Sequence, residues 1–306
     1  MSAQPTFEPG RESSFGEWTA AAGLSLLAAA VVVSPFFFLG TASGHDISFH
    51  MASWLDVAGQ WKQGILFPRW AEWANFGYGE PRFIFYPPLS WLLGALLGRF
   101  VPWNAVTAVL VVCLLTLAGV AMYALLRSSV ANRSSALLGA ACFTANPYAL
   151  LIVYARSDFA ELLAMALFPL VFLGVFRICG YVREFRPAGG FPDVAALALP
   201  FAAVWLANAP AAVILTYGTG LLLVLGAIER RSLRPLFSGG AGMLLGLALA
   251  SFYLIPAIYE QRWVQIAGAL AGGLTPAENF LYATTADREH DAFNRMASNM
   301  AVRAEL

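Results

Sequence analysis

The chain has 306 residues, of which 59% are hydrophobic and 12% carry a charge, and its mean hydropathy is +0.67. Soluble domains carry about 25% charged residues, so this composition indicates an integral membrane protein. The formal net charge is zero, which argues against a nucleic-acid partner. The cysteines lie in apolar runs without metal-ligand spacing, and they are interpreted as buried apolar residues.

The sequence predicts an all-α protein, a polytopic bundle of transmembrane helices with a long outer first loop. Residues 1–17 are polar and are interpreted as a cytoplasmic tail. Trp18–Gly40 is the first span, close to the ~20 residues that a bilayer core requires, and we expect it to be retained rather than cleaved. The loop at 41–88 mixes aromatic and polar residues, which predicts an amphipathic helix lying in the membrane interface.

The rest of the predicted membrane domain, which extends over 18–260, alternates apolar runs with short polar linkers. Leu89–Val101 is too short for an ordinary span at about 1.5 Å per residue, so we expect it to be re-entrant or interfacial. The remaining runs bring the prediction to about seven crossings and about seven to eight membrane segments. These runs are Asn104–Leu126, Ser134–Ala155, Asp158–Tyr181, Asp193–Asn208, Ala209–Ile228 and Leu236–Ile258. The polar end, 261–306, is interpreted as an outer tail.

Basic residues in short linkers set the predicted orientation, because such linkers face the cytoplasm. They are Arg127 and Arg133, then Arg183 and Arg186, and finally Arg230, Arg231 and Arg234. All of these linkers lie on one side of the membrane if Leu89–Leu126 makes a single net crossing, with its short first segment re-entrant or interfacial. The same count places the loop at 41–88 and the turn at 156–161 on the outer side, so the unusual polar residues are expected to meet there.

His45 and Asp46 stand just beyond the outer end of the first span. A carboxylate in this place could deprotonate an acceptor or hold a divalent metal ion, and His45 could orient it or bind a phosphate. The structural alternative is that Asp46 caps a helix that starts near Ile47, because Asp is a favoured N-cap residue. Both interpretations remain open.

A second charged motif, Arg156-Ser157-Asp158-Phe159-Ala160-Glu161, opens a later span. Asp158 and Glu161 are three positions apart and share a helix face. Charges at the entrance of a membrane helix usually face the bundle interior or water, and Arg156 could hold a phosphate or pair with Asp46. The structural alternative is that acidic residues in a first turn suit the helix dipole.

Two further polar residues have structural explanations beside a role in substrate binding. Asn208 is followed by Pro210 at the turn of an apolar hairpin, and turn formation accounts for it. His50 is expected as an interfacial side chain on the amphipathic helix, and contact with a substrate is the alternative.

A first span, a long outer loop that opens with an acidic motif, and the segment Tyr86-Pro87-Pro88-Leu89 resemble the GT-C superfamily of membrane glycosyltransferases. Within it, GHDISFH, the FPRW at 67–70, GYGEPRFIFYPPL and RSDFAE resemble bacterial pyruvoyl-tetrahydropterin-synthase-related membrane proteins. The resemblance extends over about residues 19–260. It implies transfer of a sugar from a polyprenyl-phosphate donor to a glycan, lipid or protein acceptor at the outer face of a bacterial inner membrane.

By position, the resemblance implies that Asp46 is the catalytic base or a metal-associated carboxylate. It also implies that Arg156 contacts the donor phosphate and that Asp158 and Glu161 complete a polar cavity. Such proteins usually continue with further spans, so the polar end at 261–306 is interpreted as the remnant of a truncation.

The alternative function is a non-enzymatic membrane protein, which would be a transporter, a lipid-handling protein or an inactive structural subunit. Transporters tend to place charges at the bilayer midplane, often in repeated halves. In this sequence the charges lie at helix ends and no internal repeat is visible, which favours the enzyme.

Overall fold

A computed structural model describes residues 15–129, 132–182 and 190–265, together with 288, 291–292 and 295–296. The predicted tails 1–17 and 261–306 lie largely outside these ranges, as do Arg183 and Arg186. The chain divides into two compact units, Met1–Pro256 and Ala257–Leu306. The regular elements of the described residues are helices, apart from one bridge between Ala71 and Glu80, so the predicted all-α class is confirmed.

The helices follow one another with short connections. The first half of the chain contains α1 (Phe15–Leu39), α2 (Ile47–Lys62), η1 (Asn75–Gly77), α3 (Arg82–Phe85), α4 (Pro88–Leu97), α5 (Trp103–Ser129), α6 (Arg133–Thr144) and α7 (Pro147–Leu150). The second half contains η2 (Leu151–Arg156), α8 (Phe159–Cys179), α9 (Phe191–Ala207), α10 (Ala209–Arg230), α11 (Arg234–Leu249), α12 (Ser251–Glu260) and η3 (Gln261–Trp263).

Within the described residues, 5 helices are long and apolar enough to cross a membrane, or up to 6 if a bent pair forms one span. The five are α1, α5, the stretch Arg133–Arg156 formed by α6, α7 and η2, α8, and α10. The bent pair consists of α11 and α12, and α4 and α9 are shorter apolar helices. A multi-pass membrane protein is therefore established, while the count of seven to eight segments stays a prediction.

Two of the predicted continuous spans are broken, one beside a local capping motif and the other beside a contact with a distant segment. Between α6 and α7, the Asn146 side chain accepts a hydrogen bond from the Ala149 amide at 2.9 Å, and Pro147 lacks the amide that a continuing helix would use. The pair α11 and α12 bends by 71°. The start of α12 is held by the outer loop, because Tyr253 donates a hydrogen bond to the Phe85 carbonyl at 2.8 Å.

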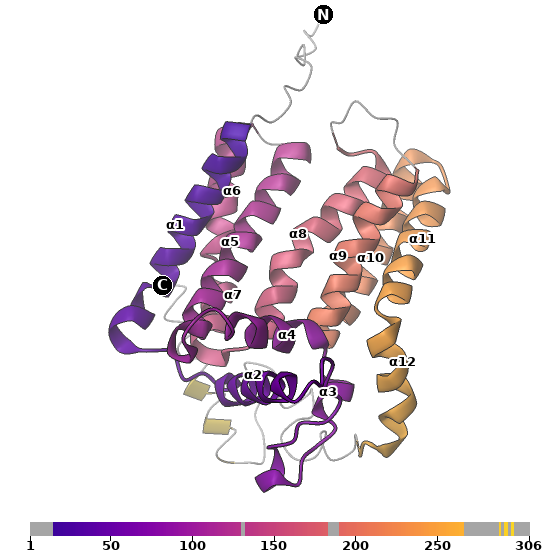
Figure 1. Ribbon diagram of the computed structural model, residues 1–306. Coiled ribbons are helices and arrows are strands. Elements are labelled where there is room, and N and C mark those ends of the chain that lie inside the picture. The colour runs from indigo at the N-terminus through magenta and orange to yellow at the C-terminus, as the bar shows by residue number, and fades with distance from the viewer. Residues whose placement is uncertain are drawn as a thin grey trace, which may run out of the picture. The chain divides into compact units, whose positions relative to one another are not determined.

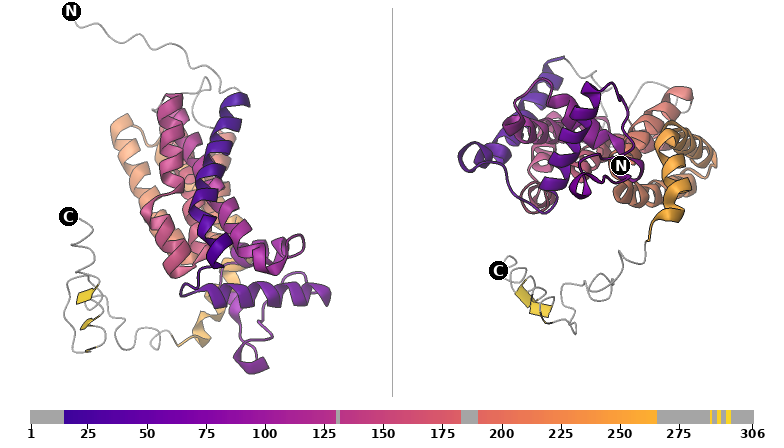
Figure 2. Two further views of the ribbon diagram at one scale, coloured as in Figure 1. Left: turned by 90° about the vertical axis from the view of Figure 1, so that its left-hand side faces the viewer. Right: turned by 60° about the horizontal axis from the view of Figure 1, so that its bottom comes forward.

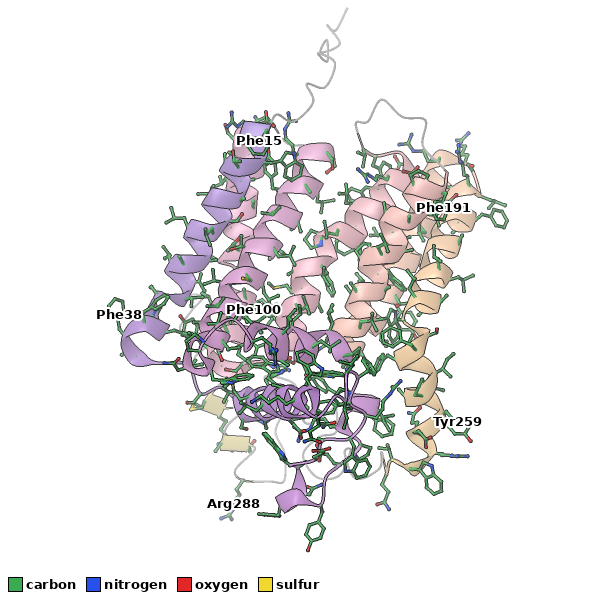
Figure 3. The ribbon with its side chains drawn as sticks, viewed as in Figure 1. Phe15, Phe38, Phe100, Phe191, Tyr259 and Arg288 are labelled. Atoms are coloured by element: carbon green, nitrogen blue, oxygen red, sulfur yellow. The ribbon has the colours of Figure 1, made fainter. Side chains whose placement is uncertain are left out.

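Helix α8 forms the centre of the bundle and packs against α5, α9 and α10. Its residues are apolar all round and most of them are buried, which is the pattern of a helix enclosed by others. On the outside of the bundle large apolar side chains stay exposed, and Figure 3 shows Phe38 and Phe191 pointing away from it. Such surfaces suit contact with lipid.

The loop helices and the basic linkers lie at opposite ends of the bundle. Figure 1 shows the start of α1 and the ends of α5 and α10 at one end, and α2, α3 and α4 at the other. At the linker end, Glu17 accepts hydrogen bonds from Arg127 and Tyr123, both at 3.2 Å. The assignment of this end to the cytoplasm stays a prediction.

The outer loop is a folded layer rather than a solvated connection. Figure 2 shows α2 lying across the ends of the bundle helices, and α2 packs against α4. Its buried Asp56 accepts hydrogen bonds from the Gln60 side chain at 2.8 Å and from the Trp73 amide at 3.1 Å. These bonds join α2 to the segment that follows it, and they fix the structure of the layer at this end of the bundle.

Candidate functional site

The two charged motifs of the sequence, separated by more than a hundred residues, are joined by backbone hydrogen bonds. The amide of His45 donates to the Ala155 carbonyl at 3.1 Å, and that of Asp46 donates to the Arg156 carbonyl at 2.8 Å. The Gly44 amide donates to the Ser157 hydroxyl oxygen at 3.1 Å. Residues 44–46 and 155–157 therefore form one short ladder, which we call the outer ladder.

The backbone on both sides of the outer ladder is suited to this close approach. A Cβ atom at Gly44 would lie 2.5 Å from the Ser157 Oγ and 2.7 Å from the Ser157 backbone nitrogen, so only glycine fits there. Ser157 itself is fully buried and adopts a left-handed conformation, with a φ of 53°. It directly follows the π-helical turn η2, and such turns and strained residues frequently occur at functional sites.

Asp46 lies at the N-cap position of α2, but its side chain makes no capping hydrogen bond. Instead its Oδ1 lies 2.6 Å from the His45 Nδ1. The Asp46 side chain is 27% exposed and that of His45 is 87% exposed, so both are open to solvent. The structure does not support the capping alternative for the Asp46 side chain, which leaves its carboxylate available at the edge of the bundle.

Asp158 caps a helix and also lies close to two basic side chains. Its Oδ1 accepts a hydrogen bond from the Glu161 amide at 3.0 Å and so caps α8. The same oxygen lies 3.5 Å from the His50 Nε2, and its Oδ2 lies 3.5 Å from the Arg156 Nη2. Burial alone would raise the pKa of the Asp158 carboxyl, but His50, the Glu161 amide and Arg156 lower it below its ordinary value.

Arg156 pairs with the acidic residues of its own motif rather than with Asp46. Its Nη1 lies 2.6 Å from the Glu161 Oε2, and the Tyr148 hydroxyl donates a hydrogen bond to the other oxygen of Glu161. The Arg156 side chain remains 45% exposed. A guanidinium has five N–H donors, so Arg156 retains donors for a further anion on its exposed side.

His50 differs most from its predicted environment. It is only 1% exposed, and the prediction of an interfacial side chain is therefore wrong. Its ring lies 5.2 Å from that of Phe159 and 6.1 Å from those of Trp54 and Tyr86. The face of α2 that carries His50 covers the bundle, so aromatic packing buries the imidazole and directs Nε2 toward Asp158. His50 thus contacts Asp158 from the buried side of the site. A direct contact of His50 with a substrate stays a prediction, and the burial of the side chain disfavours it.

Sequence reasoning assigned no role to Tyr86, which lies beside this cluster. Burial raises the pKa of its phenol well above the ordinary value, and the charges of Asp158 and Asp46 raise it further. The hydroxyl thus remains a proton donor at any physiological pH. The signal was present in the sequence, because Pro87 confines the preceding residue to an extended conformation and so fixes the direction of Tyr86.

Asn208 has the structural role that the hairpin suggested. Its side-chain oxygen accepts a hydrogen bond from the Ala211 amide at 3.0 Å and caps α10. No hydrogen bond joins this side chain to the charged cluster within the described residues. A role for Asn208 in substrate binding therefore stays a prediction.

The residues around Asp46 do not form a ready site for a divalent metal ion. Within the described ranges, no group of three or more His, Cys, Asp or Glu side chains is placed to hold one. His45 and Asp46 contact each other, while Asp158 and Glu161 are occupied by Arg156 and other donors. Metal sites formed by protein side chains usually need more converging ligands than this pair supplies.

Comparison with known proteins identifies the family of the chain. No curated protein matches it. Residues 83–271, more than half of the chain, match the family described as "6-pyruvoyl-tetrahydropterin synthase related domain; membrane protein". The matched range contains Arg156, Asp158 and Glu161, while His45 and Asp46 precede it. The chain therefore belongs to the 6-pyruvoyl-tetrahydropterin synthase related family of membrane proteins.

Proposed function

We propose that this protein is a membrane glycosyltransferase of the GT-C type. It transfers a sugar from a polyprenyl-phosphate donor to a glycan, lipid or protein acceptor at the outer face of a bacterial inner membrane. The single observation that supports this proposal most is the outer ladder, because its backbone hydrogen bonds hold Asp46, whose carboxylate is partly exposed, beside Arg156, whose guanidinium is exposed, at the end of an apolar bundle. This is where a lipid-linked sugar phosphate and its acceptor would meet.

In the proposed reaction, Asp46 accepts the proton of the acceptor hydroxyl. The acceptor oxygen then attacks the anomeric carbon as the bond from that carbon to the phosphate oxygen breaks, and polyprenyl phosphate leaves. His45, 2.6 Å from Asp46, keeps the carboxylate oriented. The remaining donors of Arg156 bind the phosphate, whose charge increases as the bond breaks.

Asp158 and Glu161 fix Arg156 rather than contact the sugar. Arg156 lies between their carboxylates, and Asp158 is itself held by the buried His50. These contacts restrict the Arg156 side chain before the donor binds. Less conformational entropy of this side chain is therefore lost when the donor binds. Together the two carboxylates and Arg156 carry a net negative charge, which is unfavourable for a phosphate. The donor phosphate must therefore bind on the exposed side of the Arg156 guanidinium, away from the carboxylates.

The test compares wild type with Asp46→Asn in reconstituted vesicles supplied with a panel of polyprenyl-phosphate sugars. Loss of a general base lowers turnover by about 100-fold or more. Glu72→Gln is the matched control, because Glu72 lies in the same loop and its carboxylate makes no hydrogen bond or ion pair with described residues; its turnover should equal that of wild type. Turnover that survives in Asp46→Asn would remove Asp46 from the mechanism, and no turnover with any donor would refute the enzyme.

A lipid-handling or transport protein is the second candidate function, and the bent pair of α11 and α12 is the observation that favours it. Broken helices are common in transporters, where they line the substrate path. The same vesicles separate the two functions. Movement of a labelled polyprenyl phosphate across the bilayer without sugar transfer, and without dependence on Asp46, would support the non-enzymatic function.

A further inference from the structure

A groove lies between α10 and α11 at the linker end of the bundle, opposite to the candidate site. Its volume is about 320 Å³. Apolar side chains form most of its wall, and its polar members are Arg231 and Ser232 in the short turn between the two helices. The lining residues are Val224, Ala227, Ile228, Arg231, Ser232, Leu233 and Leu236. We call this feature the α10–α11 groove.

The arginines of this turn differ in whether they have partners. The Arg230 guanidinium donates a hydrogen bond to the Gly180 carbonyl at 2.7 Å and lies over the Tyr181 ring at 5.0 Å. Arg231 and Arg234 are exposed, and neither guanidinium has a hydrogen bond or ion pair with a described residue. Arg231 lines the groove, and Arg234 directly follows Leu233, which also lines it. The mouth of the groove therefore carries two positive charges that form no ion pair with a described side chain.

The groove continues an apolar surface of α10. Ile214, Tyr217 and Leu221 are exposed and recur at helical spacing, and the same face then reaches Val224 and Ile228 in the groove. Helix α10 is long and apolar enough to span a membrane, and it lies side by side with α11 (Figure 1). This face of α10 suits contact with lipid tails, and it leads from the membrane interior to the two arginines.

We propose that the α10–α11 groove binds one anionic phospholipid. The phosphate of its headgroup contacts Arg231, Arg234 and the Ser232 hydroxyl, and an acyl chain follows the apolar wall along Val224 and Ile228. Charge complementarity at the mouth and the continuous apolar face together select a lipid over a free anion. The inference is independent of the proposed sugar transfer, because it concerns the opposite end of the bundle.

Binding is measured on the purified full chain in neutral detergent by native mass spectrometry, with phosphatidylglycerol and phosphatidylcholine as probes. Each arginine near a lipid headgroup strengthens binding by roughly fivefold, so the double variant R231A/R234A should bind phosphatidylglycerol about 30-fold more weakly. Val224→Trp fills the groove from an exposed position and should also weaken binding while it leaves both charges in place. Wild type should bind phosphatidylcholine more weakly than phosphatidylglycerol, and the affinity for phosphatidylcholine should not change in R231A/R234A.

Arg133→Ala is the matched control, because Arg133 is an exposed arginine at the same end of the bundle and has no described side-chain partner. It should bind phosphatidylglycerol like wild type, and R231K/R234K, which keeps both charges, should retain most of the affinity. The proposal is overturned if R231A/R234A binds phosphatidylglycerol as tightly as wild type, or if Arg133→Ala loses as much affinity. Displacement of the lipid by inorganic phosphate at equal concentration would also overturn it, because the ligand would then be a free anion.

Discussion

Replacing Gly44 by alanine tests the outer ladder most directly. The new Cβ would lie 2.5 Å from the Ser157 Oγ, 2.7 Å from the Ser157 nitrogen and 2.8 Å from the Arg156 carbonyl carbon. Two of these are backbone atoms that cannot rotate away, so residues 44–46 must withdraw from 155–157. Overpacking of this kind costs about 1–3 kcal/mol, and each hydrogen bond that is lost costs about 1 kcal/mol. Withdrawal relieves the clash but breaks the three hydrogen bonds of the outer ladder, so we expect a loss of about 3 kcal/mol in the free energy of unfolding.

The measurement is equilibrium unfolding of the full chain in mixed micelles, followed by tryptophan fluorescence. Gly23→Ala in α1 is the control, because no atom lies within 4 Å of the added Cβ and alanine favours the helix. Its free energy of unfolding should stay within about 0.5 kcal/mol of wild type or rise slightly. If Gly44→Ala unfolds like Gly23→Ala, the two motifs are not in contact, and the site built on that contact is refuted.

The remaining predictions concern the support of the site. Because the pKa of Asp158 is lowered, ionised Asp158 stabilises the fold fully above its ordinary pKa of 3.8, and this contribution is lost as pH falls through the lowered value. Asp158→Asn should therefore be less stable than wild type in thermal unfolding at neutral pH, and the difference in stability should narrow as the pH falls below 3.8; a constant difference would contradict the assignment. In Gly94→Ala the Cβ would lie 2.3 Å from the ring of the buried Trp54, so α4 should move from α2 at a cost of about 1–3 kcal/mol. An unchanged tryptophan emission spectrum would rule out this movement.

Much of the fold could be predicted from apolar runs, since each predicted span corresponds to a helix or to a broken pair of helices. The breaks were harder to predict. Asn146-Pro147 carries a local capping signal, whereas the bend between α11 and α12 lies beside a hydrogen bond from Tyr253 to the Phe85 carbonyl. A contact between residues so far apart in sequence leaves no local pattern.

The candidate site shows the same division. His45, Asp46 and Asp158 could be identified as candidate site residues from the sequence, because charged residues beside membrane spans are rare. The burial of His50 was not visible, because α2 carries polar residues on the face that packs against the bundle as well as on the other face. The left-handed conformation of Ser157 was equally hidden, since it depends on the close approach of Gly44.

The outer ladder has a consequence for the synthesis of the protein. Gly44 and Ser157 are 113 positions apart, and at about 5–20 residues per second the ribosome delivers Ser157 on the order of 10 s after Gly44. During this interval α2 lacks its final partner, and its buried residue His50, whose polar neighbour is Asp158, must remain in water rather than in lipid. The loop must therefore stay on the aqueous side of the membrane before residues 155–157 are synthesised and the site can form. Variants of the ladder should therefore lower the yield of correctly inserted protein as well as its final stability.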